Sequence, residues 1–352
     1  MGQFPTHPAA VDAAFLSKVL GAGVARVQHQ GIGNGLVGDS ARFDITYAAG
    51  SSGPASIAGK FPAADETSAG TAKALRLYEK EVGFYRDIAP HVAIRTPKVY
   101  FAEHDPASGD FLLLMEDCGP AEQGDQLAGC TYEQALTCMR ELAALHGPSY
   151  GKAALTDLPI LVTSDEVRAF TSTGYVGACA AFAAKYAGEM TDADLAIVAA
   201  TGEKSAALWQ REPDQIQSIV HGDFRLDNML FAICGGAEPM VTLDWQTVVA
   251  GNPLTDLGYF MGAGIGEELR RKHSDDLIAA YAEALKRHGG PNLTDIETSD
   301  GYAHGALHGV TTAVFSAAFV EDNPRAKAIF QSMAQGACSL VRELDALRIL
   351  ET

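Results

Sequence analysis

Basic residues are scarce in this sequence. It contains 26 Lys and Arg against 44 Asp and Glu, a formal net charge of −18 at pH 7. Nucleic acids and anionic membrane surfaces attract basic proteins, so we expect neither as a partner. The acidic excess lies mainly after residue 118 and could attract a cationic small molecule, although an acidic surface that maintains solubility is the more common cause.

Long apolar runs and paired cysteines are also missing. No stretch of about 18 consecutive apolar residues is present, and no basic start precedes an apolar segment, so we expect no membrane span and a cytoplasmic protein. The six cysteines form no C-x-x-C pair and no Cys/His cluster, which argues against both a disulfide framework and a zinc site. They are Cys118, Cys130, Cys138, Cys179, Cys234 and Cys338.

What is present is enough apolar sequence for a large core. With 352 residues and 47% hydrophobic content, the chain supports one large domain or two smaller ones sharing a cleft. Alternating apolar residues predict strands near 43–47, 55–62, 97–105 and 111–120, with a helix before Gly21 and another over 71–88. Helical periodicity dominates afterwards, over segments starting at Thr131 and over 165–188, 191–211, 266–288, 300–320 and 325–349.

The most informative stretch runs from Ser218 to Phe260. His221, Asp223 and Asn228 follow a short apolar run with the spacing H-x-D-x-x-x-x-N, and Asp244 ends a second apolar run sixteen residues later. Each residue alone could be an ordinary turn former. Together they match the catalytic loop and the metal-binding Asp of phosphoryl-transfer kinases, and their oxygen atoms are the ligands that Mg²⁺ prefers.

Two long motifs carry a family resemblance. VHGDFRLDNMLF followed by LDWQTVVAGNPLTDLGYF resembles the aminoglycoside phosphotransferase and choline kinase superfamily, and the agreement extends from about Gly31 to Phe260. The Gln after Asp-Trp and the run LLLMEDCG are similar to the ecdysteroid kinase-like branch, while HGDFRLDN is similar to domains fused to acyl-CoA dehydrogenases. The resemblance implies an α+β, bilobal, protein-kinase-like fold: an antiparallel-sheet lobe over 1–118 ending in a hinge, and a mainly helical lobe over 119–352.

The resemblance also implies a nucleotide site in the first lobe. A glycine-rich turn with Gly33 and Gly35 would bring backbone N–H groups close to phosphates, although it does not fit G-x-G-x-x-G strictly. Ala58 and Lys60 reproduce the A-x-K spacing, with Ala58 over the adenine and Lys60 on the phosphates. EVGFY resembles the family's E-x-x-F-Y helix, which makes Glu81 the candidate partner of Lys60 and Glu79 its competitor. The hinge from Met115 to Gly119 would bind adenine through its backbone, at positions Glu116 and Cys118.

The remaining roles concern the second lobe and the metal. Asp223 would orient the acceptor hydroxyl and take its proton, Asn228 and Asp244 would hold Mg²⁺, and Arg225 could stabilise the transferring phosphoryl group. We expect His221 to brace the loop rather than to titrate. Asp256 is expected to fix the loop backbone, His146 to be structural and Asp227 to be a turn residue.

The predicted function is therefore ATP-dependent transfer of the γ-phosphoryl group to a hydroxyl of a small organic molecule. Asp244-Trp245-Gln246 replaces Asp-Phe-Gly and no Ala-Pro-Glu follows, which favours a small acceptor over a protein. The acceptor stays open among an antibiotic, a choline-like amine, a sterol-like alcohol and a hydroxyacyl thioester. A nucleotide-binding regulator without transfer activity is the alternative. A metal-dependent hydrolase would need more ligands than this cluster offers.

Overall fold

The chain forms two compact units. The computed structural model describes residues 4–32, 38–210, 218–293, 295–296, 299–319 and 323–351. The first unit comprises Met1–Pro90, Arg95–Ala121 and Ala232–Thr247; the second comprises His91–Ile94, Glu122–Phe231 and Val248–Thr352. The division into two functional lobes at residues 118 and 119 stays a prediction.

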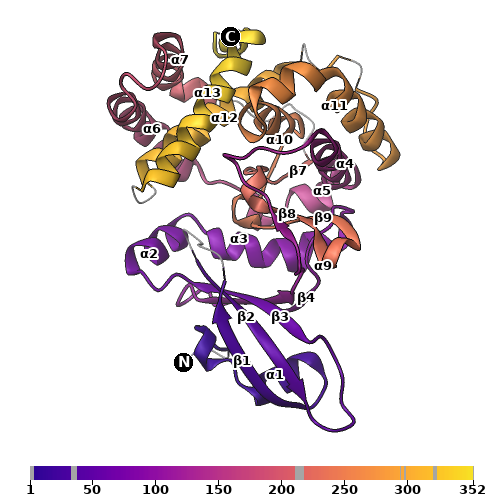
Figure 1. Ribbon diagram of the computed structural model, residues 1–352. Coiled ribbons are helices and arrows are strands. Elements are labelled where there is room, and N and C mark those ends of the chain that lie inside the picture. The colour runs from indigo at the N-terminus through magenta and orange to yellow at the C-terminus, as the bar shows by residue number, and fades with distance from the viewer. Residues whose placement is uncertain are drawn as a thin grey trace. The chain divides into compact units, whose positions relative to one another are not determined.

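A five-stranded antiparallel sheet forms the body of the first unit (Figure 1). Its strands lie in the order β1-β2-β3-β5-β4, so that β3 is central and β5 pairs beside it. The strands are β1 (Val24–Gly31), β2 (Gly38–Tyr47), β3 (Ser56–Pro62), β4 (Val99–His104) and β5 (Phe111–Glu116). All of the strands predicted for this part of the chain are therefore present.

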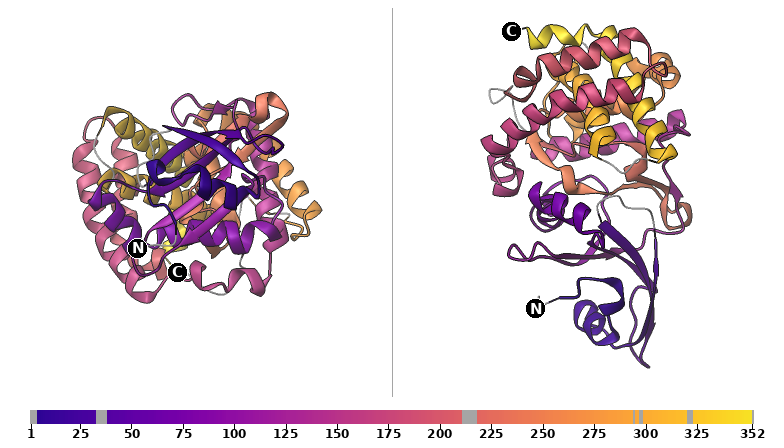
Figure 2. Two further views of the ribbon diagram at one scale, coloured as in Figure 1. Left: turned by 90° about the horizontal axis from the view of Figure 1, so that it is seen from below. Right: turned by 90° about the vertical axis from the view of Figure 1, so that its left-hand side faces the viewer.

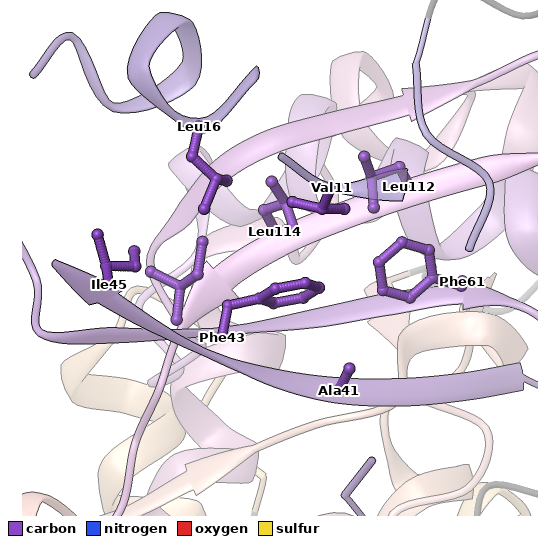
Figure 3. Packing of buried hydrophobic residues seen from close by; sticks show 9 residues of the cluster. Val11, Leu16, Ala41, Phe43, Ile45, Phe61, Leu112 and Leu114 are labelled. Carbon is purple, nitrogen blue, oxygen red and sulfur yellow. The ribbon is translucent and has the colours of Figure 1, made fainter. Parts of the chain in front are cut away.

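One face of this sheet carries an apolar core shared with the N-terminal helix α1 (Ala13–Leu20). Asp12 caps the helix by accepting a hydrogen bond from the Phe15 amide, and Gly21 ends it in the left-handed region at φ 64°. Figure 3 shows the buried side chains of this cluster facing one another. They are Val11, Leu16, Ala41, Phe43, Ile45, Ile57, Phe61, Leu112 and Leu114.

Strand alternation sends the intervening residues to the opposite face. Since side chains along a strand point alternately to its two sides, Arg42 on β2 and Ala58 and Lys60 on β3 face away from the α1 core. The chemistry predicted for Ala58 and Lys60 thus belongs to one face, and the packing with α1 belongs to the other.

The helix predicted over 71–88 is wrong as a continuous element. Three segments replace it: α2 (Glu66–Ala74), α3 (Leu77–Gly83) and a π-helical turn, Phe84–Ile88. Arg76 breaks the helix because its backbone lies in the left-handed region at φ 58°, which a right-handed helix cannot continue. Leu75, expected on the buried face, is exposed, whereas Tyr78, Val82 and Tyr85 are buried as predicted.

A late segment of the chain returns to the first unit. After α9 (Ile233–Gly236), a tight turn with Ala232 and Cys234 at positive φ, strand β9 (Glu238–Thr242) runs back toward Asp244. The Cys234 amide donates to the Cys118 carbonyl at 2.9 Å, and the Gly235 amide donates to the Pro120 carbonyl at 2.8 Å. These bonds attach the segment to the end of β5 and its continuation.

The second unit is mainly helical. In the right-hand view of Figure 2 its long helices lie side by side, and α12 contacts α6, α10 and α13. The capping box predicted at Thr131 and Gln134 is confirmed at the start of the first helix. The helices are α4 (Tyr132–Ser149), α5 (Ala153–Thr156), α6 (Asp165–Lys185), α7 (Asp192–Glu203), α8 (Ser205–Gln210), α10 (Leu254–Tyr259), α11 (Glu267–Arg287), α12 (Asp300–Phe319) and α13 (Pro324–Glu343).

Short strands frame the polar cluster of the second unit. Strand β7 (Ser218–Val220) pairs with β10 (Val249–Gly251), and β6 (Glu122–Gln123) pairs with β8 (Met229–Ala232). The loop between β7 and β8 holds the H-x-D-x-x-x-x-N residues. Of the helices among the described residues, none combines the length and apolar character needed to cross a membrane.

Candidate active site

Lys60 forms a tight ion pair in the first unit. Its Nζ lies 2.6 and 2.9 Å from the two carboxylate oxygens of Glu81 on α3, and 3.3 Å from Oδ1 of Asp244. Glu81 is only 1% exposed, whereas Lys60 and Asp244 retain 23% and 30% of their side-chain exposure. A buried anchor therefore holds an ammonium group that still reaches solvent.

The competitor Glu79 does not contact Lys60 in this arrangement. It binds Arg76 instead, through Nε at 2.8 Å and Nη2 at 2.9 Å. The geometry thus selects Glu81 as the partner of Lys60, in agreement with the expectation from EVGFY.

Burial and charge act in opposite directions on this pair. Burial tends to lower the pKa of Lys60, but the Asp244 and Glu81 carboxylates outweigh it and raise that pKa above its ordinary value. Burial raises the pKa of Glu81, while Lys60 and the Trp245 backbone oppose the increase. We conclude that Lys60 is fully protonated at neutral pH.

Asp244 is held in an unusual backbone conformation. Its φ is 65°, in the left-handed region that costs a non-glycine residue about 1–3 kcal/mol. Gln246 donates to Asp244 Oδ2 at 3.3 Å, and the ring of Trp245 stacks on Phe84 with 3.6 Å between centroids and 5° between planes. Asp244 is therefore held in place through both of the residues that follow it, Trp245 and Gln246.

The hinge positions Glu116 and Cys118 are engaged through several groups. The Glu116 carboxylate forms an ion pair with Arg95 at 3.0 Å, and its amide donates to the Lys98 carbonyl. The Cys118 carbonyl accepts from Cys234, and burial raises the pKa of the Cys118 thiol to about 12. Neither side chain is available as a catalytic group, which agrees with a role through the backbone.

In the second unit, Asp256 fixes the backbone before Asp223, as expected. Its Oδ2 accepts from the His221 amide at 2.7 Å and its Oδ1 from the Gly222 amide at 2.9 Å. His146 Nε2 lies 3.2 Å from the same carboxylate. Burial favours the neutral acid, but His146 and these amides outweigh it and lower the pKa of Asp256.

His221 contacts the backbone of its own loop. Its side chain is fully buried, and its Nδ1 accepts a hydrogen bond from the Asp223 amide at 3.2 Å. This contact ties the ring to the backbone at Asp223.

The Asp223 carboxylate lies at the centre of a hydrogen-bond network. Oδ1 accepts from the Tyr259 hydroxyl at 2.5 Å and from Arg225 Nε at 3.0 Å, while Oδ2 accepts from Asn228 Nδ2 at 3.0 Å. The side chain retains 19% of its exposure. A carboxylate fixed by three donors and still accessible is suited to orienting a hydroxyl group.

Arg225 is held between two acids. Besides Asp223, it binds Asp227 Oδ2 through Nη1 at 2.6 Å, and only 14% of its side chain is exposed. The Asp227 carboxylate also accepts a hydrogen bond from the backbone N–H of Gln126 at 2.9 Å, so Asp227 does more than form a turn. The guanidinium group thus lies beside the carboxylate in a fixed orientation.

Asn228 and Asp244 belong to different units, and each offers an oxygen atom. Asn228 Nδ2 donates to both the carbonyl and Oδ2 of Asp223, which directs its amide oxygen away from Asp223. A carboxylate and an amide oxygen are ligand types that fit Mg²⁺. Gly33 and Gly35 lie outside the described residues.

The sequence interpretation missed two residues of the second unit, Tyr259 and His308. His308 Nε2 lies 2.8 Å from the Gly222 carbonyl, and its ring packs edge-on against Tyr259 at 5.3 Å. Tyr259 stands in the motif NPLTDLGYF, three residues after Asp256, which was the available signal. His308 follows His304 by one helical turn in a helix with little charge, a weaker indication.

Comparison with known proteins identifies related sequences. Residues 37–290 match the model of the ecdysteroid kinase-like family. The curated chicken (Gallus gallus) protein acyl-CoA dehydrogenase family member 11 is 41% identical over 46 residues, which is 13% of this chain and 6% of that protein. This match thus spans only a small part of the curated relative.

Solved structures share the fold. Choline kinase from Cryptosporidium parvum superposes with a TM-score of 0.59 at 10% identity, covering 92% of this chain and 91% of that one. A putative aminoglycoside phosphotransferase from Ralstonia eutropha superposes with a TM-score of 0.55 at 16% identity, covering 94% of this chain and 97% of that one. Plasmodium vivax ethanolamine kinase gives 0.52 at 12% identity, with 90% and 84% covered. The predicted α+β, protein-kinase-like fold is confirmed.

Proposed function

Because the chain belongs to the ecdysteroid kinase-like family, we propose that it is an ATP-dependent phosphotransferase acting on a hydroxyl group of a small organic molecule. The observation that carries the proposal is the contact of Lys60 with both oxygens of Glu81, at 2.6 and 2.9 Å. In phosphoryl-transfer kinases this pair positions the lysine on the nucleotide phosphates. A degenerate kinase typically loses such a group, so its presence argues against a regulator without activity.

The first unit supplies nucleotide binding in this proposal. Lys60 binds the phosphates, Glu81 holds its ammonium group, and Ala58 leaves room for the adenine. The backbone at Glu116 and Cys118 binds the edge of the base, and Gly33 and Gly35, which lie outside the described residues, are expected from the sequence to approach the phosphates. Each role follows from the family resemblance, and the contact between Lys60 and Glu81 supports the roles given to these two residues.

The second unit supplies the acceptor chemistry. Asp223 accepts a hydrogen bond from the acceptor hydroxyl and takes its proton as the oxygen attacks the γ-phosphorus, while the bond from that phosphorus to the bridging oxygen breaks and ADP leaves. Tyr259 and Asn228 keep the carboxylate from rotating, since each donates to one of its oxygens. Arg225 places positive charge beside the reacting oxygens, and His221 and Asp256 fix the backbone of the loop.

Asn228 and Asp244 would hold Mg²⁺. When bound, the ion would neutralise part of the negative charge on the phosphates. The strained φ of Asp244 and its contacts with Lys60 and Gln246 fix the carboxylate before any ligand arrives, so little ordering is left to the binding step.

A coupled assay of ATP consumption with Mg²⁺ tests the proposal. The acceptor panel should span aminoglycosides, choline-like amines, sterols and hydroxyacyl-CoA esters, with Asp223→Asn as the inactive control. An acceptor-dependent rate that vanishes in Asp223→Asn supports the phosphotransferase. Nucleotide binding, measured by melting-temperature shift on the same samples, separates the alternative: binding without turnover favours a regulator, and no binding contradicts both.

A further inference from the structure

Arg42 lies on the sheet face that carries Ala58 and Lys60, and no role has been assigned to it above. We propose that its guanidinium group covers the purine base of the bound nucleotide and contributes to nucleotide affinity. The inference rests on the proposed function and adds a base-contacting residue to it.

The strand register places Arg42 beside the expected position of the base. Arg42 on β2 pairs directly with Ala58 on β3, and Ser40 pairs with Lys60. Side chains of directly paired residues point to the same side of a sheet. Arg42 therefore stands next to the residue over the adenine, one step along the ladder from the residue on the phosphates.

Asp117 holds the guanidinium group at the hinge. Arg42 Nη2 donates to Asp117 Oδ1 at 2.9 Å, and Arg42 Nε lies 2.8 Å from Oδ2. Ser56 donates to the same carboxylate at 2.7 Å and the Gly119 amide at 3.1 Å. Burial would favour neutral Asp117, but Arg42 and Ser56 outweigh it and lower its pKa. Arg42 is thus tethered at the base end of the site and is not directed toward the phosphates.

Gly119 shows how closely the guanidinium approaches the hinge backbone. A Cβ atom added at Gly119 would lie 2.8 Å from Arg42 Nη2 and 3.2 Å from Asp117 Oδ1. The space beside the hinge is therefore filled by the arginine, and glycine at this position permits the contact.

The chemistry of arginine fits this place. A guanidinium group is planar, and it can stack on an aromatic ring while its edge stays bonded to a carboxylate. Asp117 accepts a hydrogen bond from Nη2 and lies within ion-pair distance of Nε, so it holds one side of the group and leaves the flat face for the base. Arg42 retains 35% of its side-chain exposure, enough for a ligand to reach it.

Two probes separate a base contact from a phosphate contact. MgATP presents both groups, whereas magnesium tripolyphosphate presents phosphates alone. Dissociation constants for both are measured by calorimetry on wild type and Arg42→Met. We expect Arg42→Met to raise the dissociation constant for MgATP about tenfold and to change that for magnesium tripolyphosphate less than twofold. The kcat at saturating ATP should stay within about twofold, because the contact is equal in ground and transition states.

Arg26→Met is the matched control, since Arg26 is an exposed arginine on β1 of the same sheet. It should bind both probes like wild type. If Arg42→Met does not fold, Arg42→Lys is scored instead, since it keeps the charge and loses the planar group. Equal weakening of both probes, or unchanged ATP affinity, overturns the role of Arg42. A wild-type protein that binds neither probe contradicts the proposed function itself.

Discussion

The Tyr259 hydroxyl donates to Oδ1 of Asp223 at 2.5 Å, a short contact between two residues 36 positions apart. Burial raises the pKa of Tyr259 well above its ordinary value, and the Asp223 carboxylate raises it further. The phenol is therefore a proton donor throughout the neutral and mildly alkaline range.

Removing this hydroxyl tests its positioning role. We expect Tyr259→Phe to lower kcat about tenfold, because a hydrogen bond to a charged group is worth about 1.5–3 kcal/mol and the carboxylate becomes freer to rotate. Nucleotide affinity, measured by calorimetry, should not change. Thr312→Val, which removes a hydroxyl 3.4 Å from His308 Nε2 and has no hydrogen bond to Asp223 among the described contacts, serves as a control with near wild-type kcat. Loss of nucleotide affinity in Tyr259→Phe would indicate general damage instead.

The two glutamates of α3 provide a matched pair. Glu81→Gln removes the charge that holds Lys60, so kcat/KM for ATP should fall about a hundredfold. Glu79→Gln removes only the contact with Arg76 and should stay within about twofold. Steady-state kinetics at varied ATP measures both. A larger loss for Glu79→Gln would contradict the geometry described here.

Asp256 predicts a defined dependence of stability on pH. Its pKa is lowered in the folded protein from an ordinary value of 3.8, so its contribution is complete above that value and is lost as pH falls through the folded pKa. Asp256→Asn should lower the free energy of unfolding by about 3 kcal/mol at pH 7. Melting temperatures from pH 7 to pH 3 should show the two proteins converging below about pH 4. A constant difference would show that the charge is unimportant.

The stacked rings next to Asp244 predict a loss of stability. Trp245 is fully buried against Phe84, so Trp245→Ala should cost about 3–5 kcal/mol of unfolding free energy, whereas Trp245→Phe keeps a ring and should cost less. Denaturant titration followed by circular dichroism measures both. Equal losses for the two variants would mean that the ring contact is not what stabilises this region.

Metal dependence can be read without any acceptor. If Asp244 holds Mg²⁺, ATP should raise the melting temperature more with Mg²⁺ than with EDTA, and Asp244→Asn should remove most of the difference. Asp44→Asn, at an exposed position of β2, should keep it. A full Mg²⁺ effect in Asp244→Asn would exclude this carboxylate as a ligand.

Strands and capped helices were predictable because their signals are local. Alternating apolar residues identified β2 and β3, a continuous apolar run identified β5, and Thr131 with Gln134 marked the start of α4. The helix break at Arg76 was not predictable, since neither glycine nor proline marks that position. Leu75 was consequently assigned to the wrong face.

The site was predictable in part for a similar reason. The A-x-K and H-x-D-x-x-x-x-N patterns, and an Asp sixteen residues after the second, can be read from one sequence. They contain Lys60, Asp223, Asn228 and Asp244. Tyr259 and Arg42 were missed because their partners lie 36 and 75 positions away, so nothing in the local pattern connects them. Contacts of this kind become visible only once the fold brings the segments together.

Strand β3 also constrains how this chain can change in length. Ile57, Gly59 and Phe61 pack under α1, while Ala58 and Lys60 face the other way. Inserting one residue directly before Lys60 would exchange the faces of the residues that follow it, turning the Lys60 ammonium group toward the apolar core and Phe61 away from it. Single-residue insertions and deletions should therefore be eliminated here during evolution, whereas a change of length in the turn around Ser51–Pro54, which lies outside both strands, leaves the alternation within β3 intact.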